Sequence, residues 1–251
     1  MNSTLLMCPL PPQKTRFPAA FVLCAAVLVF ASCSGTVDGV VKQDGSAEIE
    51  LEIALGNQMA GRLRLLNSIL RGGAQDAQPP LLDGPAIALS MAAAPGISAV
   101  SLRNTSPTAV AGAVSVSRID AFLSLPARAG GAPFIRYDPE GRLVISLDLE
   151  TGPQLLSLLS EDIRDYLSTL AAPVATGFPL TKAAYREIAA SLHGPQVADE
   201  IVAARIPITI EFPRPVKEVR GGVAQGRRAR FDLPLIDLLV LERPLMYEVT
   251  W

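Results

Sequence analysis

Histidine and cysteine are nearly absent from this chain, and their scarcity excludes most familiar catalytic and metal sites. His193 is the single histidine, and the three cysteines are Cys8, Cys24 and Cys33. A histidine-based triad, a Cys–His pair or a Cys/His zinc site needs more of these residues than the region after residue 32 contains. We therefore expect no metal site and no cofactor held by such side chains.

Glycine-rich phosphate motifs and serine nucleophile motifs are lacking as well. The sequence contains no P-loop, no dinucleotide fingerprint, no Gly-x-Ser-x-Gly elbow and no Ser-x-x-Lys pair. Two facing carboxylates are the catalytic arrangement that this composition still allows. The acidic candidates lie in expected helices, where carboxylates are equally explained as solvated groups: Glu161, Asp162, Asp165, Asp199 and Glu200. A hydrolase that uses carboxylates alone is therefore the alternative to a protein that is not an enzyme.

Charge is sparse, and neither sign dominates the whole chain. The 251 residues hold 22 basic and 24 acidic side chains, and only Lys14 and Arg16 are charged among the first 32 residues. The remaining 219 residues therefore carry 20 basic and 24 acidic groups, a net charge near −4. A nucleic-acid-binding domain is typically strongly basic, so we expect no nucleic-acid partner. A chain of this length without an evident linker is expected to form one domain, over residues 33–251.

The first 32 residues have the pattern of a secretory signal peptide. Lys14 and Arg16 precede an apolar stretch at residues 17–30, and no acidic side chain occurs in the segment. As a helix this stretch would rise about 21 Å, whereas the hydrocarbon core of a bilayer is about 30 Å thick. We therefore expect a signal peptide at residues 1–32 that is cleaved after export.

Cys33 stands at the end of the apolar stretch, directly after two small residues. The run Phe30-Ala31-Ser32-Cys33 resembles the lipobox of bacterial lipoproteins, in which the cysteine is acylated and becomes N-terminal after cleavage. Acylation would account for a single leftover cysteine in an exported chain. The alternatives are an uncleaved signal anchor that extends to residue 37 and a plain buried thiol at Cys33.

Short segments with strand periodicity recur along the exported region. Residues 47–55 alternate apolar with acidic side chains, which is typical of a strand with one buried and one solvated face. A turn at Asp44-Gly45 joins it to a strand at residues 37–41, which leaves only residues 33–36 as a tether. Further hairpins are expected at residues 97–116 and 134–149, and strands at residues 206–212, 227–233, 236–241 and 245–251.

Helical periodicity separates these strands into groups. Two helical pairs are expected, at residues 59–70 with 85–94 and at residues 182–192 with 195–204, and a further helix at residues 155–170. Thr181 is a suitable N-cap, and His193 before Gly194 suits a helix C-terminus. Antiparallel hairpins interrupted by helical pairs favour a single α+β domain, with the helices packed on the sheet, over a doubly wound parallel sheet.

One basic segment, between Arg214 and Arg230, contrasts with the acidic remainder of the exported region. It holds six cations against the single acid Glu218: Arg214, Lys217, Arg220, Arg227, Arg228 and Arg230. Such a hairpin would attract anionic lipid headgroups, at about 1 kcal/mol per charge near the surface. Contact with the anchoring membrane requires that the segment face the same way as the start of the first strand. The alternative is an edge hairpin that charge keeps soluble and unpaired.

Two short stretches give the exported region a resemblance to the LppM-type bacterial lipoprotein domain. They are residues 40–46, which contain the Asp-Gly turn, and residues 208–213, which lead to Val216 and Gly221-Gly222. The resemblance implies an α+β domain with a lipid-binding role and no known catalysis, and it carries over no binding residue. We therefore expect a non-enzymatic lipoprotein, anchored to a membrane of the cell envelope through lipidated Cys33, that binds lipid or an envelope protein partner.

Overall fold

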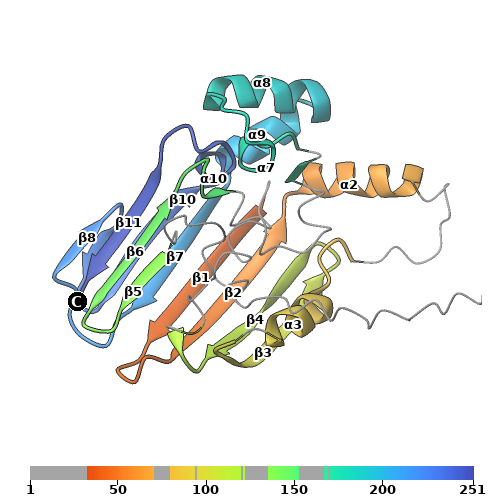
Figure 1. Cartoon of the computed structure of the whole chain (residues 1–251). Helices are drawn as coiled ribbons and strands as arrows, with labels where there is room; N and C mark the ends of the chain where they lie inside the picture. The colour runs from red at the N-terminus through yellow and green to blue at the C-terminus, as the bar shows by residue number, and fades with distance from the viewer. Residues whose placement is uncertain are drawn as a thin grey trace, which may run out of the picture.

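Two β-sheets packed on one another form the body of the molecule (Figure 1). The structure is a computed structural model, and it describes residues 33–70, 80–93, 95–119, 121, 135–152, 167–168 and 170–251. The large sheet has seven strands, in the order β3 (Ile97–Ser106), β4 (Ala109–Val116), β2 (Ala47–Leu55), β1 (Cys33–Val41), β7 (Arg205–Glu211), β10 (Arg228–Pro234) and β9 (Val223–Gln225). The small sheet has four strands, in the order β5 (Ile135–Asp138), β6 (Arg142–Leu147), β11 (Leu245–Thr250) and β8 (Glu218–Arg220).

The first hairpin forms as the alternation predicts. Side chains of β2 are alternately buried and exposed, with the glutamates Glu48, Glu50 and Glu52 in solvent. The apolar side chains of β2 face the small sheet and the helices, because only that face excludes water. At the turn, the Asp44 carboxylate accepts hydrogen bonds from the backbone N–H of Ser46 at 2.9 Å and from its hydroxyl at 2.6 Å.

Strand β1 lies in the middle of the large sheet and pairs on both sides. It is antiparallel to β2, with Cys33 opposite Leu55, and parallel to β7, with Val37 opposite Ile208. The expected antiparallel hairpins are thus joined by a parallel pair that the sequence did not predict. The long connection between β1 and β7 permits the parallel pair, since parallel strands need a crossover of a dozen or more residues.

The two sheets are joined at one edge by a tight bend. Strand β8 belongs to the small sheet and β9 to the large sheet, and only Gly221 and Gly222 separate them. A Cβ atom on Gly221 would lie 2.7 Å from the Tyr247 ring, and one on Gly222 would lie 2.5 Å from the Arg230 carbonyl oxygen. Both positions therefore need glycine, because the chain passes too close to its neighbours for any side chain.

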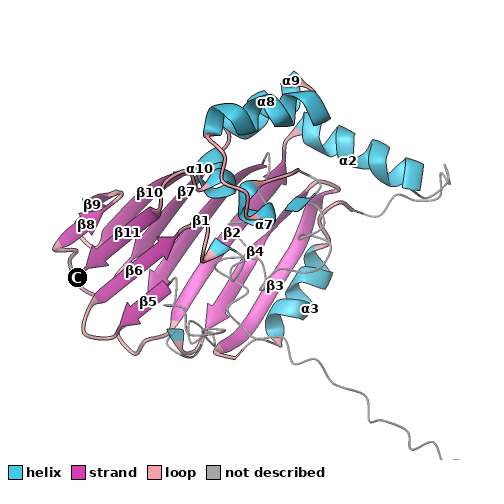
Figure 2. Cartoon of the chain, turned by 45° about the horizontal axis from the view of Figure 1, so that its top comes forward, coloured by secondary structure: helices cyan, strands magenta, loops and turns pink. Residues whose placement is uncertain are grey.

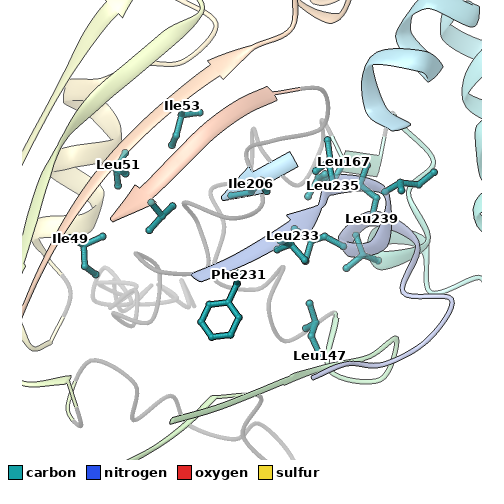
Figure 3. Packing of buried hydrophobic residues seen from close by; sticks show 14 of the residues in the cluster. Ile49, Leu51, Ile53, Leu147, Leu167, Ile206, Phe231, Leu233, Leu235 and Leu239 are labelled. Atoms are coloured by element: carbon teal, nitrogen blue, oxygen red, sulfur yellow. The ribbon is translucent and has the colours of Figure 1, made fainter. Parts of the chain in front are cut away.

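The core fills the space between the sheets and continues under the helices (Figure 3). Apolar side chains of β2, β7 and β10 meet those of β6 and of helix α10 (Leu235–Val240). The labelled members of this cluster are Ile49, Leu51, Ile53, Leu147, Leu167, Ile206, Phe231, Leu233, Leu235 and Leu239. Aromatic contacts also contribute to the core: the Phe231 and Tyr247 rings pack edge to face, with their centroids 5.3 Å apart.

Most of the helices gather at one end of the large sheet (Figures 1 and 2). They are α2 (Asn57–Leu70), α7 (Pro173–Thr176), α8 (Lys182–His193), α9 (Pro195–Ala203) and α10. Helix α3 (Gly84–Ala92) instead packs along β3. As predicted, the Thr181 hydroxyl caps α8, accepting a hydrogen bond from the backbone N–H of Ala184 at 3.1 Å. His193 ends the same helix, as expected.

Three expectations differ from the structure. Residues 236–241 were expected as a strand but, up to Val240, form α10, because a short run that is apolar at every position except Asp237 does not distinguish a buried strand from a buried helix. Strand β1 begins at Cys33, so residues 33–36 are paired with β2 and do not form a free tether. The basic segment was described as one hairpin, but its strands β8 and β9, of three residues each, pair in different sheets.

The architecture confirms the predicted α+β fold in a single domain. The expected helix at residues 155–170 lies outside the described residues, except for positions 167, 168 and 170. Within the described part of the chain, no helix combines the length and the hydropathy needed to cross a bilayer.

Candidate functional site

The end of the large sheet where the helices gather, here the helical end, contains the start of the first strand. Cys33 lies opposite Leu55, and α2 begins two residues later at Asn57. On the other side of β1, the parallel strand β7 begins at Arg205, directly after α9. The residue expected to carry the anchor is therefore flanked by the N-terminus of α2 and the C-terminus of α9.

A carboxylate links these two helices. The two oxygens of Glu200, on α9, accept hydrogen bonds from the backbone N–H groups of Gln58 at 2.9 Å and Met59 at 3.1 Å. These N–H groups belong to the first turn of α2, where backbone N–H groups have no hydrogen-bond partner within the helix. The helix dipole also favours a negative charge there. Glu200 therefore acts as a structural cap supplied by a distant segment.

Three further acids of the helical end are engaged within the fold. Asp199 pairs with Arg186 at 2.7 Å, and Asp237 pairs with the Lys182 ammonium at 2.8 Å. Glu242 accepts a hydrogen bond from the Lys182 backbone N–H at 2.9 Å. Of the acids weighed as catalytic candidates, Asp199 and Glu200 thus have structural partners, while Glu161, Asp162 and Asp165 lie outside the described residues.

A polar hollow of about 380 Å³ lies beside these groups at the helical end. Its charged lining consists of Lys182, Arg243, Asp237 and Glu242. The two cations and the two anions offset one another, so the hollow presents no field of one sign. Within the described residues, no group of three or more histidine, cysteine or acidic side chains is placed to hold a metal ion.

The basic segment lies at the opposite end of the large sheet, here the basic end. Arg228 on β10 lies opposite Glu211 on β7, and Glu211 lies opposite Val40 on β1. Val40 is seven residues after Cys33 along β1. At about 3.3 Å per residue, this level is about 23 Å from Cys33 along the strand. The segment thus faces away from the start of β1, and its contact with headgroups stays a prediction.

Four of the six basic side chains have partners that hold the fold together. Arg227 and Arg228 both pair with Glu211, at 3.3 Å and 3.0 Å. Arg214 donates a hydrogen bond to the Glu140 carbonyl oxygen at 2.6 Å, and Lys217 donates one to the Trp251 carbonyl oxygen at 3.2 Å. Among the described residues, exposed Arg220 and Arg230 make no ion pair, so they are the cations most available to a ligand.

Buried Trp251 packs against aromatic rings and a turn at the basic end. Its ring stacks on Phe212 at 4.5 Å and lies 6.0 Å from the Tyr137 ring. Its backbone N–H donates to the Gly141 carbonyl oxygen at 2.9 Å. A Cβ atom on Gly141, whose φ is +127°, would lie only 2.4 Å from the Trp251 carbonyl oxygen. The turn between β5 and β6 is therefore held tightly against the last residue.

An apolar hollow opens between the sheets at the basic end. Its cavity volume is about 60 Å³. The side chains that line it are apolar or aromatic: Val37, Val41, Ala47, Ile49, Val116, Ile119, Tyr137, Leu143, Ile208, Ile210 and Phe212, with Gly39 and Val40 of β1. Arg214 follows two residues after Phe212, and Arg227 donates to the Phe212 carbonyl oxygen at 2.9 Å. The hollow therefore lies directly beside the basic segment.

Sequence reasoning missed this hollow, although one signal for it was available. Gly39 interrupts the row of side chains that β1 points into the core, between Val37 and Val41. Glycine inside a strand often marks a close approach or a missing side chain. A Cβ atom on Gly39 would meet only the Ile210 side chain and the Thr209 carbonyl oxygen, both at 3.9 Å, so no neighbour occupies the place.

Comparison with known proteins finds a similarity among solved structures alone. No protein-family model and no curated protein matches the chain. Among solved structures, the chain is similar to the NMR structure of the folded domain of Mycobacterium tuberculosis LppM, with 13% sequence identity and a TM-score of 0.35. The match covers 87% of this chain and 88% of that chain. This structural neighbour is of the type that the sequence resembles, the likeness is distant, and the lipidation of Cys33 stays a prediction.

Proposed function

We propose that this chain is a membrane-anchored, non-enzymatic domain of the cell envelope that binds lipid, with the end of an apolar chain in the hollow between its sheets. The observation that carries the proposal is the hollow itself, whose walls are apolar and whose neighbours are cationic. An anionic amphiphile matches both features, since its chain end suits the walls and its headgroup suits the arginines.

Gly39 supplies the space for the ligand. The inward-facing row of β1 includes Gly35, Val37, Gly39 and Val41, and of these Gly39 lies between the two buried valines. A β-branched residue at the central position would both fill the hollow and suit a strand better than glycine. Glycine at this position therefore lowers the stability of the fold somewhat and leaves an apolar gap on the central strand of the large sheet.

The size of the hollow limits what it can hold. A volume of about 60 Å³ is well below the roughly 150 Å³ of an engineered cavity that binds benzene. The hollow therefore takes the tip of an alkyl or isoprenoid chain, and the rest of the ligand lies along the surface. Burial of a few methylene groups gives about 0.8 kcal/mol each, so the affinity is modest.

The test is mass spectrometry of the full-length protein purified from membranes, in native and in denaturing conditions. Lipid that is bound but not covalently attached appears only in the native spectrum, whereas acyl groups on Cys33 appear in both. We expect a retained lipid in the native spectrum. A bare protein mass together with no binding to liposomes contradicts the proposal.

A matched pair of variants on one strand locates the ligand. Gly39→Val fills the hollow, and Thr36→Val places the same side chain on the exposed face of β1. We expect Gly39→Val to lose the lipid while its melting temperature stays equal or rises, and Thr36→Val to keep the lipid. Retention of the lipid by Gly39→Val would move the binding site elsewhere.

A further inference from the structure

The anchor and the fold meet without a spacer. Strand β1 begins at Cys33 and is paired with β2 from that residue onward. The anchor is either the acylated Cys33 or the retained apolar segment at residues 17–30. Each of these places the bilayer directly before this strand. One extended residue spans at most about 3.6 Å, so no free chain separates the membrane from the sheet.

The orientation of the sheet at the anchor is therefore constrained. Because β1 is held between β2 and β7, the large sheet moves as a unit with its first residue. The elements that surround Cys33 are those of the helical end, and the basic end lies about 23 Å further along the strands. That distance is nearly three times the Debye length of about 8 Å at physiological salt.

We propose that the helical end rests on the bilayer that carries the anchor, and that the basic segment and the apolar hollow point away from it. This inference depends on the membrane anchoring in the proposed function, and it specifies which surface the bilayer covers. It differs from the expectation that the basic segment touches the headgroups of its own membrane, which stays untested. The lipid bound at the basic end is then one presented from outside that bilayer.

Exposed apolar side chains at the helical end suit a bilayer surface. Phe178, between α7 and α8, is 73% exposed, while Leu192 on α8 and Leu65 on α2 are 50% and 49% exposed. The last two belong to neighbouring helices, since Arg62 of α2 donates a hydrogen bond to the Leu192 carbonyl oxygen at 3.3 Å. Large apolar groups at a surface with cationic neighbours are typical of segments that lie at the membrane interface.

The charges of the helical end also favour anionic headgroups. Asp199, Asp237 and Glu200 are engaged with Arg186, Lys182 and the first turn of α2. By contrast, the hydrogen bonds of Arg62 and Arg205 in the described structure go to backbone carbonyl oxygens, so these two cations have no carboxylate partner there, while exposed Glu187 of α8 is an acid of the same end without an ion pair there. Anionic lipid attracts such residual cations over a Debye length.

The test measures the depth of single nitroxide labels on the full-length protein in vesicles of phosphatidylethanolamine and phosphatidylglycerol. Cys8 and Cys24 are replaced by serine, and Cys33 is kept for acylation. Phe178→Cys and Leu192→Cys report on the helical end, whereas Gln43→Cys and Gln225→Cys report on exposed positions of the basic end. Accessibility to oxygen and to a water-soluble nickel chelate is measured for each label.

We expect the labels at 178 and 192 to be severalfold less accessible to nickel than those at 43 and 225. Equal accessibility at all four positions, or protection at 43 and 225, overturns the orientation. In a second measurement, Phe178→Ser with Leu192→Ser should raise nickel access to a label at Leu65→Cys. Leu89→Ser on α3, where Leu89 is 78% exposed, is the control and should leave that access unchanged.

The result separates the orientation from the anchoring on which it rests. Mass spectrometry of the N-terminus decides the anchoring, since a chain with unmodified Cys33 and no apolar segment has no anchor. An anchored protein with the reverse label pattern contradicts only the orientation. Retention of lipid in the native spectrum is independent of both outcomes.

Discussion

The two ends of the large sheet are closed in different ways, although the same strands run through both. At the helical end, short helices are held by ion pairs and by the Glu200 cap. At the basic end, an aromatic stack on Trp251 is held by close-packed glycine and by cations bonded to carbonyl oxygens. The difference shows that the segments that connect or follow the strands, and not the strands themselves, decide which chemistry each end presents.

The comparison also changes the meaning of the basic segment. The sequence does not distinguish its six cations from one another. In the structure, Glu211 forms ion pairs with two of them, and backbone carbonyl oxygens accept hydrogen bonds from two more. Of the six cations, Arg220 and Arg230 remain available to a ligand. A count of charges therefore overstates the field that a ligand meets at this surface.

The largest expected effect concerns the turn against Trp251. Gly141→Ala should destabilise the fold by about 3 kcal/mol, because its Cβ atom would overlap the Trp251 carbonyl oxygen and its φ is unfavourable for alanine. Trp251 is the single tryptophan, so urea unfolding followed by its fluorescence gives the free energy directly. Gly226→Ala is the control, since φ is +61° there and no atom lies within 4 Å of the added Cβ.

We expect the control to cost only about 1 kcal/mol, the strain of a left-handed residue without the clash. Equal losses at Gly141 and Gly226 would show that the basic end is not locked through Trp251. The two ends would then differ less than the structure indicates.

A smaller effect is expected at the helical end. Glu200→Ala removes both hydrogen bonds to the first turn of α2 and should destabilise the fold by about 2 kcal/mol. Asp199→Ala on the same helix removes only an exposed ion pair with Arg186 and should cost less than about 0.5 kcal/mol. Thermal unfolding monitored by circular dichroism compares them, and similar losses would refute the capping role of Glu200.

The smallest effect has the opposite sign. Tyr185 of α8 is fully buried, and its hydroxyl has no hydrogen-bond partner among the described residues. Tyr185→Phe removes this polar group and should stabilise the fold by about 1 kcal/mol. A loss of stability in urea unfolding would instead reveal a partner for the hydroxyl.

The same residue makes stability depend on alkaline pH. Burial raises the pKa of Tyr185 well above its usual value near 10, and burial with the nearby Asp237 and Asp232 raises the pKa of Tyr247 to about 12. The unfolded chain releases these protons first, so stability falls as pH rises above about 10. Tyr185→Phe should weaken this fall, as unfolding measured between pH 9 and pH 12 would show.

Local patterns in the sequence predicted most elements, because strand and helix periods depend on nearby residues. The alternation in residues 47–55, the Asp44 turn and the Thr181 cap all have the predicted form. Residues 236–241 were assigned wrongly because that short run is apolar at every position except Asp237. The hollow, the Glu200 cap and the pairing of Glu211 with two arginines depend on contacts between distant segments, which a single sequence does not encode locally.

The sequence by itself determined the α+β class, the expected export signal before Cys33 and the presence of a basic segment. The tertiary structure decided where the basic segment lies relative to Cys33. Parallel pairing of β1 with β7 places the start of β1 beside α9 and the end of β7 beside Arg228. That pairing joins residues more than 170 positions apart, and its direction depends on the path of the whole chain between them.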